Sequence, residues 1–140
     1  MSKIKGIDHI AIAVRDLNKA VEAFSKLLDS KPEVIEEVPE EGVRIAMFKV
    51  GNAFIELLEP LSPDSTLAKF LEKRGEGIHH IALRVKDITE AMDHVRRAGL
   101  KLIYGEAREV ARGNRKINFI HPKSLHGVLL ELVERIKKGE

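Results

Sequence analysis

The sequence predicts an α+β fold in which a βαβββ unit occurs twice, with a linking helix between the copies. Three observations support this prediction: a phrase that opens both halves, capping residues before apolar helical spacing, and short strands after each helix. The phrase is "GIDHIAIAV" at residues 6–14 and "GIHHIALRV" at residues 77–85, so that Gly77 repeats Gly6 and His80 repeats His9. Because further matches follow in the same order, we interpret the chain as a duplicated half-domain.

The repeat extends to the end of each half. At the same offset two further pairs match, namely Arg44 with Arg115 and Phe48 with Phe119. The motif "IELLE" at 55–59 matches "LELVE" at 130–134 with a larger offset. The difference predicts four additional residues in the hairpin before the last strand, around "HPKSLHG".

Each opening strand leads into a helix. The aspartates that end these strands, Asp16 and Asp87, are residues that cap helix N-termini, and apolar residues follow them at helical spacing. We expect the first helix to end before Lys31-Pro32 and the second to end at Gly99.

Short strands are expected after each helix. Their predicted ranges are 33–38, 43–50 and 53–59 in the first half, and 100–104, 115–121 and 127–134 in the second. The stretch "SPDSTLAKFLEKRGEG" predicts a linking helix over about 64–75, capped by Ser65 or Asp64 and stopped by Gly75. The half-repeats therefore cover about 5–60 and 77–135 of a single domain, residues 1–140.

The composition excludes several classes of function. A hydrophobic content of 44% over 140 residues is typical of a compact globular protein. The formal net charge is only +2, from 24 basic and 22 acidic residues, so no nucleic-acid partner is expected. The absence of cysteine excludes disulfides and thiolate chemistry. Without a membrane-length apolar run or a signal-peptide pattern, we expect a cytoplasmic protein with no membrane partner.

Strand alternation singles out two pairs of polar residues. His9 and His80 fall on the strand face away from the helix, among alanines, whereas His79 falls on the opposite face and receives no role. Glu56 and Glu131 have apolar neighbours on both sides, where an ionised carboxylate is costly without a cation or hydrogen-bond donors. Each residue alone is typical of a packed histidine or a solvent-facing glutamate. As two repeat-related pairs, they predict a divalent cation site.

These residues and the stretches around them resemble the vicinal oxygen chelate superfamily, and within it the methylmalonyl-CoA epimerase family. The resemblance runs from "IDHIAIAV" to "GVLLELVE", and its most specific parts are "ELLEPLSPDSTLAKFLEKRGEGIHHIALRV" and "GNRKINFIHPKSLHGVLLEL". It implies tandem βαβββ units forming a rolled mixed sheet around a metal site, in a protein that works as a homodimer. It also implies metal ligation by the four residues His9, Glu56, His80 and Glu131. Co²⁺ is the expected ion, with Mn²⁺, Ni²⁺ or Zn²⁺ as alternatives.

The activity that the resemblance implies is interconversion of (R)- and (S)-methylmalonyl-CoA through metal-assisted removal of the C2 proton and an enolate. Glu131 is the expected base and Glu56 its expected partner. Some relatives use another glutamate as the second base, and "GVRIAMF" at 42–48 offers no carboxylate there. Arg115, Lys123 and Ser124 are candidates for contact with the CoA moiety, although a solvated basic loop explains them equally well.

Three other functions fit the same fold. A glyoxalase I-type lactoylglutathione lyase uses a similar ligand set on a glutathione substrate. A ring-cleaving dioxygenase needs two histidines and one carboxylate for Fe(II), which leaves Glu56 without a role. A resistance-type binding protein often lacks the ligand set, whereas this chain has all four positions.

Overall fold

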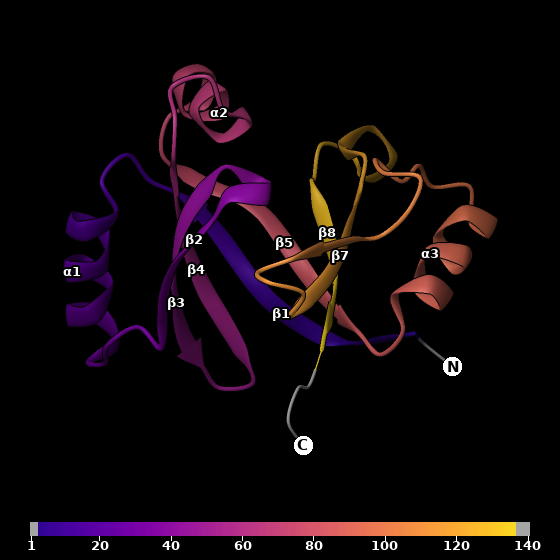
Figure 1. Cartoon of the computed structure of the whole chain (residues 1–140), viewed down its shortest axis with the longest axis horizontal. Coiled ribbons are helices and arrows are strands. Elements are labelled where there is room, and N and C mark those ends of the chain that lie inside the picture. Colours follow the sequence, from indigo (N-terminus) through magenta and orange to yellow (C-terminus); the bar gives the residue numbers. More distant parts are fainter. Residues whose placement is uncertain (1–2, 137–140) are drawn as a thin grey trace. The chain divides into compact units, whose positions relative to one another are not determined.

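A computed structural model describes residues 3–136 of the chain. The order of elements is β1-α1-β2-β3-β4, then α2, then β5-α3-β6-β7-β8 (Figure 1), which confirms the predicted α+β class and the repeated βαβββ unit. The described residues form two compact units, one of residues 9–79 and one of residues 3–8 with 80–136. None of the helices within residues 3–136 combines the length and the apolar character that a membrane crossing requires.

The unit of residues 9–79 is a four-stranded mixed sheet with a helix on one face. Its elements are β1 (Ile4–Ala13, from His9 onward), α1 (Leu17–Leu28), β2 (Val34–Val38), η1 (Pro39–Glu41), β3 (Val43–Val50), β4 (Ala53–Pro60) and α2 (Thr66–Arg74). The strand order is β2-β3-β4-β1, with β1 parallel to β4 and the other neighbours antiparallel. Helix α1 packs on β3 and β4 (Figure 1), where Phe24 contacts Phe48 at a ring separation of 6.3 Å.

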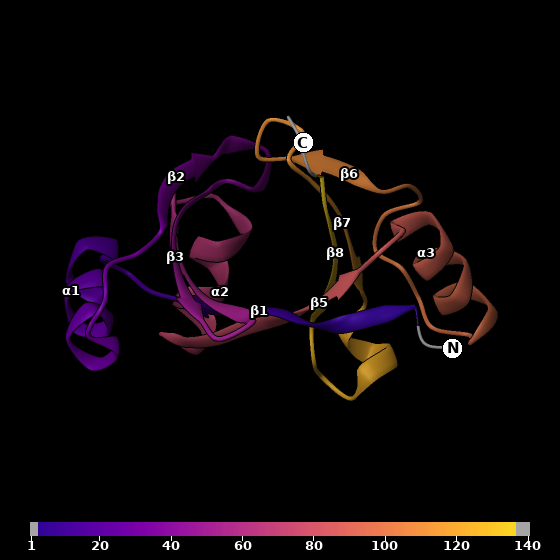
Figure 2. The same ribbon diagram turned by 90° about the horizontal axis from the view of Figure 1, so that it is seen from below.

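The other unit repeats this arrangement. Its elements are β5 (Gly77–Val85, from His80 onward), α3 (Ile88–Arg97), β6 (Arg108–Val110), β7 (Arg115–Ile120), η2 (Pro122–Leu125) and β8 (Leu130–Arg135). The strand order is β5-β8-β7-β6, with β5 parallel to β8, and β6 forms the edge beside β7 (Figure 2). Helix α3 packs on β7 and β8 through a buried cluster that includes Met92, Ile120 and Leu132.

The helix termini agree with the sequence. The side chains of Asp16, Ser65 and Asp87 each accept a hydrogen bond from the backbone N–H three residues ahead, at 3.1, 3.1 and 3.2 Å. Of the two candidate caps for α2, Ser65 is therefore the one used. Asp64 instead accepts a hydrogen bond from the Ser62 hydroxyl at 2.7 Å, which lowers the pKa of Asp64 below its usual value. Helix α1 ends earlier than Pro32, because Asp29 adopts a left-handed conformation with φ 50°.

A second glutamate of each repeat secures the helix that follows the opening strand. The backbone N–H of Leu17 donates to Glu59 at 2.7 Å, and that of Ile88 donates to Glu134 at 2.9 Å. Both N–H groups lie in the first helical turn, where no intrahelical acceptor exists. The carboxylates therefore tie the end of β4 to α1 and the end of β8 to α3.

The predicted strand over 100–104 is wrong. The short strand before β7 is β6, and Leu102 contributes only an isolated bridge to Ile120. The reason lies in the side chain of Asn118, whose Oδ1 accepts from the Tyr104 N–H at 3.1 Å and whose Nδ2 donates to the Tyr104 carbonyl at 3.0 Å. A side-chain amide thus satisfies the backbone groups that a strand would present to its neighbour.

The strand pairing also corrects the repeat alignment in β7. Met47 pairs with Glu56 in β3-β4, whereas Phe119 pairs with Glu131 in β7-β8. Phe119 is therefore the counterpart of Met47 rather than Phe48, and Arg115 is not the counterpart of Arg44. One extra residue before β7 causes this change, and three extra residues rather than four remain in the last hairpin. A shift of one residue moves a side chain to the other face of a strand.

Candidate functional site

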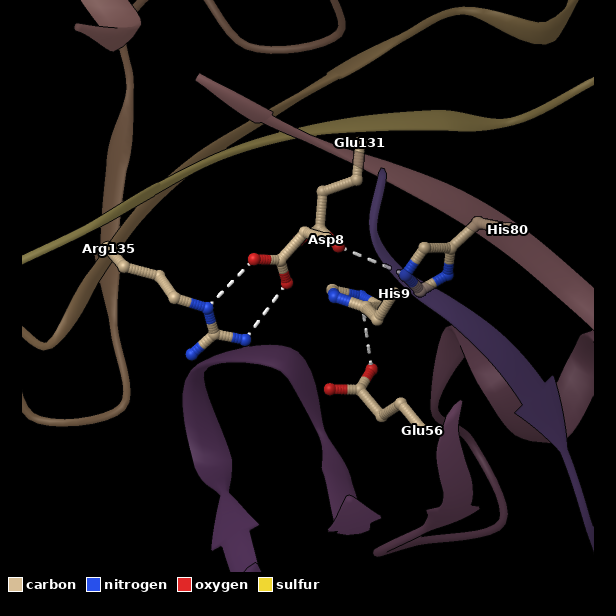
Figure 3. A network of polar contacts seen from close by, with 6 residues as sticks. All are labelled: Asp8, His9, Glu56, His80, Glu131 and Arg135. Atoms are coloured by element: carbon tan, nitrogen blue, oxygen red, sulfur yellow. Dashed lines mark hydrogen bonds and ion pairs between the residues drawn. The ribbon is translucent and has the colours of Figure 1, made fainter. Parts of the chain in front are cut away.

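The unit of residues 9–79 buries one predicted histidine–glutamate pair. His9 lies on β1 and Glu56 on the parallel neighbour β4, where Ala11 is the residue directly paired with Glu56. The Nε2 atom of His9 lies 3.5 Å from Oε1 of Glu56 (Figure 3). The structure therefore brings these two side chains together on one face of the sheet.

The other unit holds the second pair in the same arrangement. His80 lies on β5 and Glu131 on the parallel neighbour β8, where Ala82 is paired with Glu131. The Nε2 atom of His80 is hydrogen-bonded to Oε1 of Glu131 at 3.0 Å (Figure 3). In both units the glutamate therefore faces the alanine two residues beyond the histidine.

The surroundings of the two pairs match the predicted faces. The alanines Ala11, Ala13 and Ala82 are fully buried on the histidine side of their strands. On the opposite side, Val14 packs against α1 and Val85 packs against α3. The small side chains next to the histidines and the apolar side chains under the helices confirm the strand alternation read from the sequence.

The chemistry of the four side chains fits a divalent cation. They are between 1% and 6% exposed, and they offer two imidazole nitrogens and two carboxylate groups. A buried carboxylate is stabilised by a cation or by hydrogen-bond donors, and mixed nitrogen and oxygen donors suit divalent transition metals. A divalent metal is therefore the type of cofactor that these residues can hold.

Phe119 is a neighbour of the second pair that the sequence analysis did not include in the site. Its ring meets the ring of His80 edge to face, with centroids 5.6 Å apart and an interplanar angle of 86°. It also pairs across the strands with Glu131. The sequence analysis assigned no face to Phe119, and only the strand pairing reveals it.

Asp8 is a buried charged residue to which the sequence analysis gave no role. Its carboxylate is fully buried and accepts a hydrogen bond from Nε of Arg84 at 2.9 Å. It also accepts hydrogen bonds from Nε and Nη2 of Arg135 at 2.8 and 2.9 Å (Figure 3). Two guanidinium groups thus compensate the buried charge of the residue directly before His9. At the equivalent position of the second half, His79 packs edge to face on Phe70 at 4.7 Å, consistent with a structural role.

The three candidate CoA contacts lie at two ends of one strand. Arg115 is buried at the start of β7, whereas Lys123 and Ser124 belong to η2 after its end. Lys123 is exposed, and the Ser124 hydroxyl accepts a hydrogen bond from the Lys101 N–H at 3.0 Å. One phosphate group cannot contact both ends, because six residues of strand span roughly 20 Å.

Comparison with known proteins identifies the family. The family model of the Glyoxalase/Bleomycin resistance protein/Dioxygenase superfamily matches residues 8–119. The chain belongs to this superfamily. The ethylmalonyl-CoA/methylmalonyl-CoA epimerase of Cereibacter sphaeroides is 35% identical to it, over 90% of this chain and 95% of the relative's own length.

Solved structures extend the similarity to the fold. The crystal structure of methylmalonyl-CoA epimerase from Mycobacterium tuberculosis matches with a TM-score of 0.92 and 41% identity, over 99% of this chain and 93% of that one. A methylmalonyl-CoA epimerase in complex with methylmalonyl-CoA and NH4+ matches with a TM-score of 0.89 and 39% identity, over 94% and 95% of the two chains. These matches confirm the predicted vicinal oxygen chelate fold and the predicted superfamily.

Proposed function

We propose that this protein is a methylmalonyl-CoA epimerase, an isomerase that interconverts the (R) and (S) forms of its substrate. The observation that carries the proposal is the presence of two buried His–Glu pairs at equivalent positions of a duplicated unit. Relatives that match over nearly their whole length are named methylmalonyl-CoA epimerases, and one of them binds methylmalonyl-CoA. The same relatives do not favour a lactoylglutathione lyase.

His9, Glu56, His80 and Glu131 together hold one divalent metal ion in this proposal. Co²⁺ is the expected ion, and Mn²⁺, Ni²⁺ and Zn²⁺ suit the same donors. When bound, such an ion supplies Lewis-acid stabilisation for the negative charge that develops on the substrate oxygens.

The two glutamates transfer the proton. The Glu131 carboxylate accepts the C2 proton, and the electron pair of the broken C–H bond moves into the thioester carbonyl to give an enolate. In this proposal each glutamate alternates between holding the ion and carrying a proton, so that Glu56 donates a proton to the opposite face of C2 and inverts the centre. The reverse reaction exchanges the two roles.

The remaining features of the site are less specific to the reaction. Lys123 has an exposed side chain suited to a CoA phosphate, and we propose this contact for it. Contact of Arg115 and Ser124 with the CoA moiety stays a prediction. The homodimer, the cytoplasmic location and the single domain also stay predictions.

Proton exchange in D₂O tests the proposed function. Methylmalonyl-CoA is incubated with the Co²⁺-loaded protein and with the EDTA-treated protein, and the C2 proton is followed by NMR. We expect the signal to disappear with Co²⁺ and to decay about 100-fold more slowly with EDTA or in His80→Ala. His94→Ala is the matched control, because His94 is exposed on α3 and should leave exchange unchanged. A signal that persists with Co²⁺ overturns the proposal, and glutathione hemithioacetals would be assayed next.

A further inference from the structure

Phe119 lies beside both members of the second pair. It is the residue directly opposite Glu131 in the antiparallel pairing of β7 and β8, where Cβ atoms are about 4.5–5.5 Å apart. Its ring also meets the edge of the His80 ring at 5.6 Å. A substrate carbon that approaches the Glu131 carboxylate therefore meets this phenyl ring alongside it.

The phenyl ring contacts further side chains of the same unit. Tyr104 contacts Phe119 at a ring separation of 6.2 Å and an interplanar angle of 78°, and the guanidinium carbon of Arg108 lies 3.6 Å from the Tyr104 ring centroid. The fully buried Asn118 holds the Tyr104 backbone with two hydrogen bonds of 3.1 and 3.0 Å. Phe119, Tyr104 and Arg108 thus form one series of ring contacts, in which Phe119 and Tyr104 are half-buried and Arg108 is exposed.

The residue at the equivalent position in the other unit has a more flexible side chain. Met47 is the residue opposite Glu56, and it is buried. A methionine side chain is unbranched and adapts its shape to its neighbours, whereas a phenyl ring held by aromatic contacts does not. The residue beside Glu131 is therefore an aromatic ring of fixed shape, and the residue beside Glu56 is an unbranched chain that can adapt.

We infer that Phe119 sets the upper size limit for the C2 substituent of the malonyl-thioester substrate. The inference rests on the proposed function and names the side chain that determines its acyl specificity. A methyl group on C2 fits beside the ring, and a propyl chain overlaps with it. An apolar side chain that can change shape would reject a longer chain only weakly. A ring of fixed shape rejects it by steric overlap.

The test compares two substrates on matched variants. The probes are methylmalonyl-CoA and propylmalonyl-CoA, and the readouts are kcat/KM for C2 hydrogen–deuterium exchange and the Kd of each thioester by calorimetry. We expect Co²⁺-loaded wild type to prefer the methyl substrate by about 100-fold. In Phe119→Ala this preference falls by about tenfold or more, whereas in Met47→Ala it changes less than about threefold. Tyr104→Ala removes only the ring that contacts Phe119, and it lowers the preference for the methyl substrate by a smaller factor.

The possible outcomes separate the inference from the proposed function. If Phe119→Ala does not fold, Phe119→Leu, which keeps apolar bulk without the ring, serves in its place and should show about a threefold fall. An unchanged preference in a folded Phe119 variant with the wild-type Co²⁺ absorption spectrum overturns the inference alone. An equal change of the substrate preference in Met47→Ala also overturns the inference. Absence of any exchange of methylmalonyl-CoA by wild type overturns the proposed function and this inference together.

Discussion

The two His–Glu pairs have the same place in their units but different surroundings. His80 and Glu131 are hydrogen-bonded at 3.0 Å beside the ring of Phe119. His9 and Glu56 are 3.5 Å apart, and the residue opposite Glu56 is the flexible Met47. Duplication has thus kept the polar groups while the neighbours diverged. The difference indicates that the two glutamates share the proposed proton transfer unequally.

The largest expected effect separates the two glutamates. In Glu131→Gln the rate of C2 exchange should fall by about 10³-fold, because the amide cannot accept the proton. In Glu56→Gln the rate of exchange should fall only about tenfold, because Glu131 removes the proton and an amide oxygen still offers a neutral donor atom to a cation. Inversion, which needs the proton of Glu56, should fall further. Exchange of methylmalonyl-CoA in D₂O measures the exchange rate in both variants. Equal losses of the exchange rate in the two variants would show that the two glutamates contribute equally to proton transfer, and the proposed unequal contribution would be wrong.

The number of bound ions tests whether the two pairs act together. If all four side chains hold one ion, calorimetry with Co²⁺ gives one ion per chain, and His9→Ala and His80→Ala each weaken binding by about 100-fold or more. At a concentration of 100 times its Kd, Co²⁺ should also raise the free energy of unfolding by about 2.7 kcal/mol. The temperature of unfolding rises with it. His94→Ala again serves as the control. Two ions per chain, with one retained in each variant, would mean that each pair binds its own ion.

A third comparison concerns the residues directly before the two histidines. Asp8→Asn should lower the free energy of unfolding by about 2–4 kcal/mol, because the neutral amide no longer compensates Arg84 and Arg135. His79→Ala should cost only about 1 kcal/mol, the value of an edge-to-face contact with Phe70. Thermal unfolding of both variants gives the comparison. Similar losses at the two positions would show that the arginine contacts add nothing beyond packing.

Much of the site could be predicted from local patterns in the sequence. The alternation of apolar and small residues in "HIAIAV" and "HIALRV" assigned His9 and His80 to the correct face. The isolated glutamates in two apolar strands identified Glu56 and Glu131. The caps of α1 and α3 followed from residue type and spacing alone, whereas for α2 the sequence left both Ser65 and Asp64 open. Even Glu59 and Glu134 had a signal, because both close the repeated motifs "IELLE" and "LELVE".

The remainder depends on contacts that no local pattern contains. One residue inserted before β7 shifted its pairing, so the identity match of Phe119 with Phe48 joins residues on opposite faces of their strands. The contact between Asp8 and Arg135 joins residues 127 positions apart. The strand predicted over 100–104 failed because the side chain of Asn118, distant in sequence, binds the backbone of Tyr104.

The smallest expected effect concerns the capping carboxylates, where the two units are most alike. Glu134→Ala should lower the free energy of unfolding by about 1 kcal/mol, since the Ile88 N–H loses its acceptor. Glu59→Ala should cost a few tenths more, about the value of a half-exposed ion pair, because Glu59 also lies 3.9 Å from Arg44. Thermal unfolding detects each as a fall of about 2–4 °C.

Arg44→Ala is the control that isolates this ion pair. It should cost a few tenths of a kcal/mol by itself and add nothing in the Glu59→Ala background, because the charge that it pairs with is gone. The double variant Glu59→Ala, Glu134→Ala should show the sum of the single effects, since the two caps share no partner among their hydrogen bonds. The rate of C2 exchange should stay within about twofold of wild type in each variant. A larger loss of exchange would mean that the helix anchors control the geometry of the His–Glu pairs, and the equivalence of the two units would then extend from stability to the reaction.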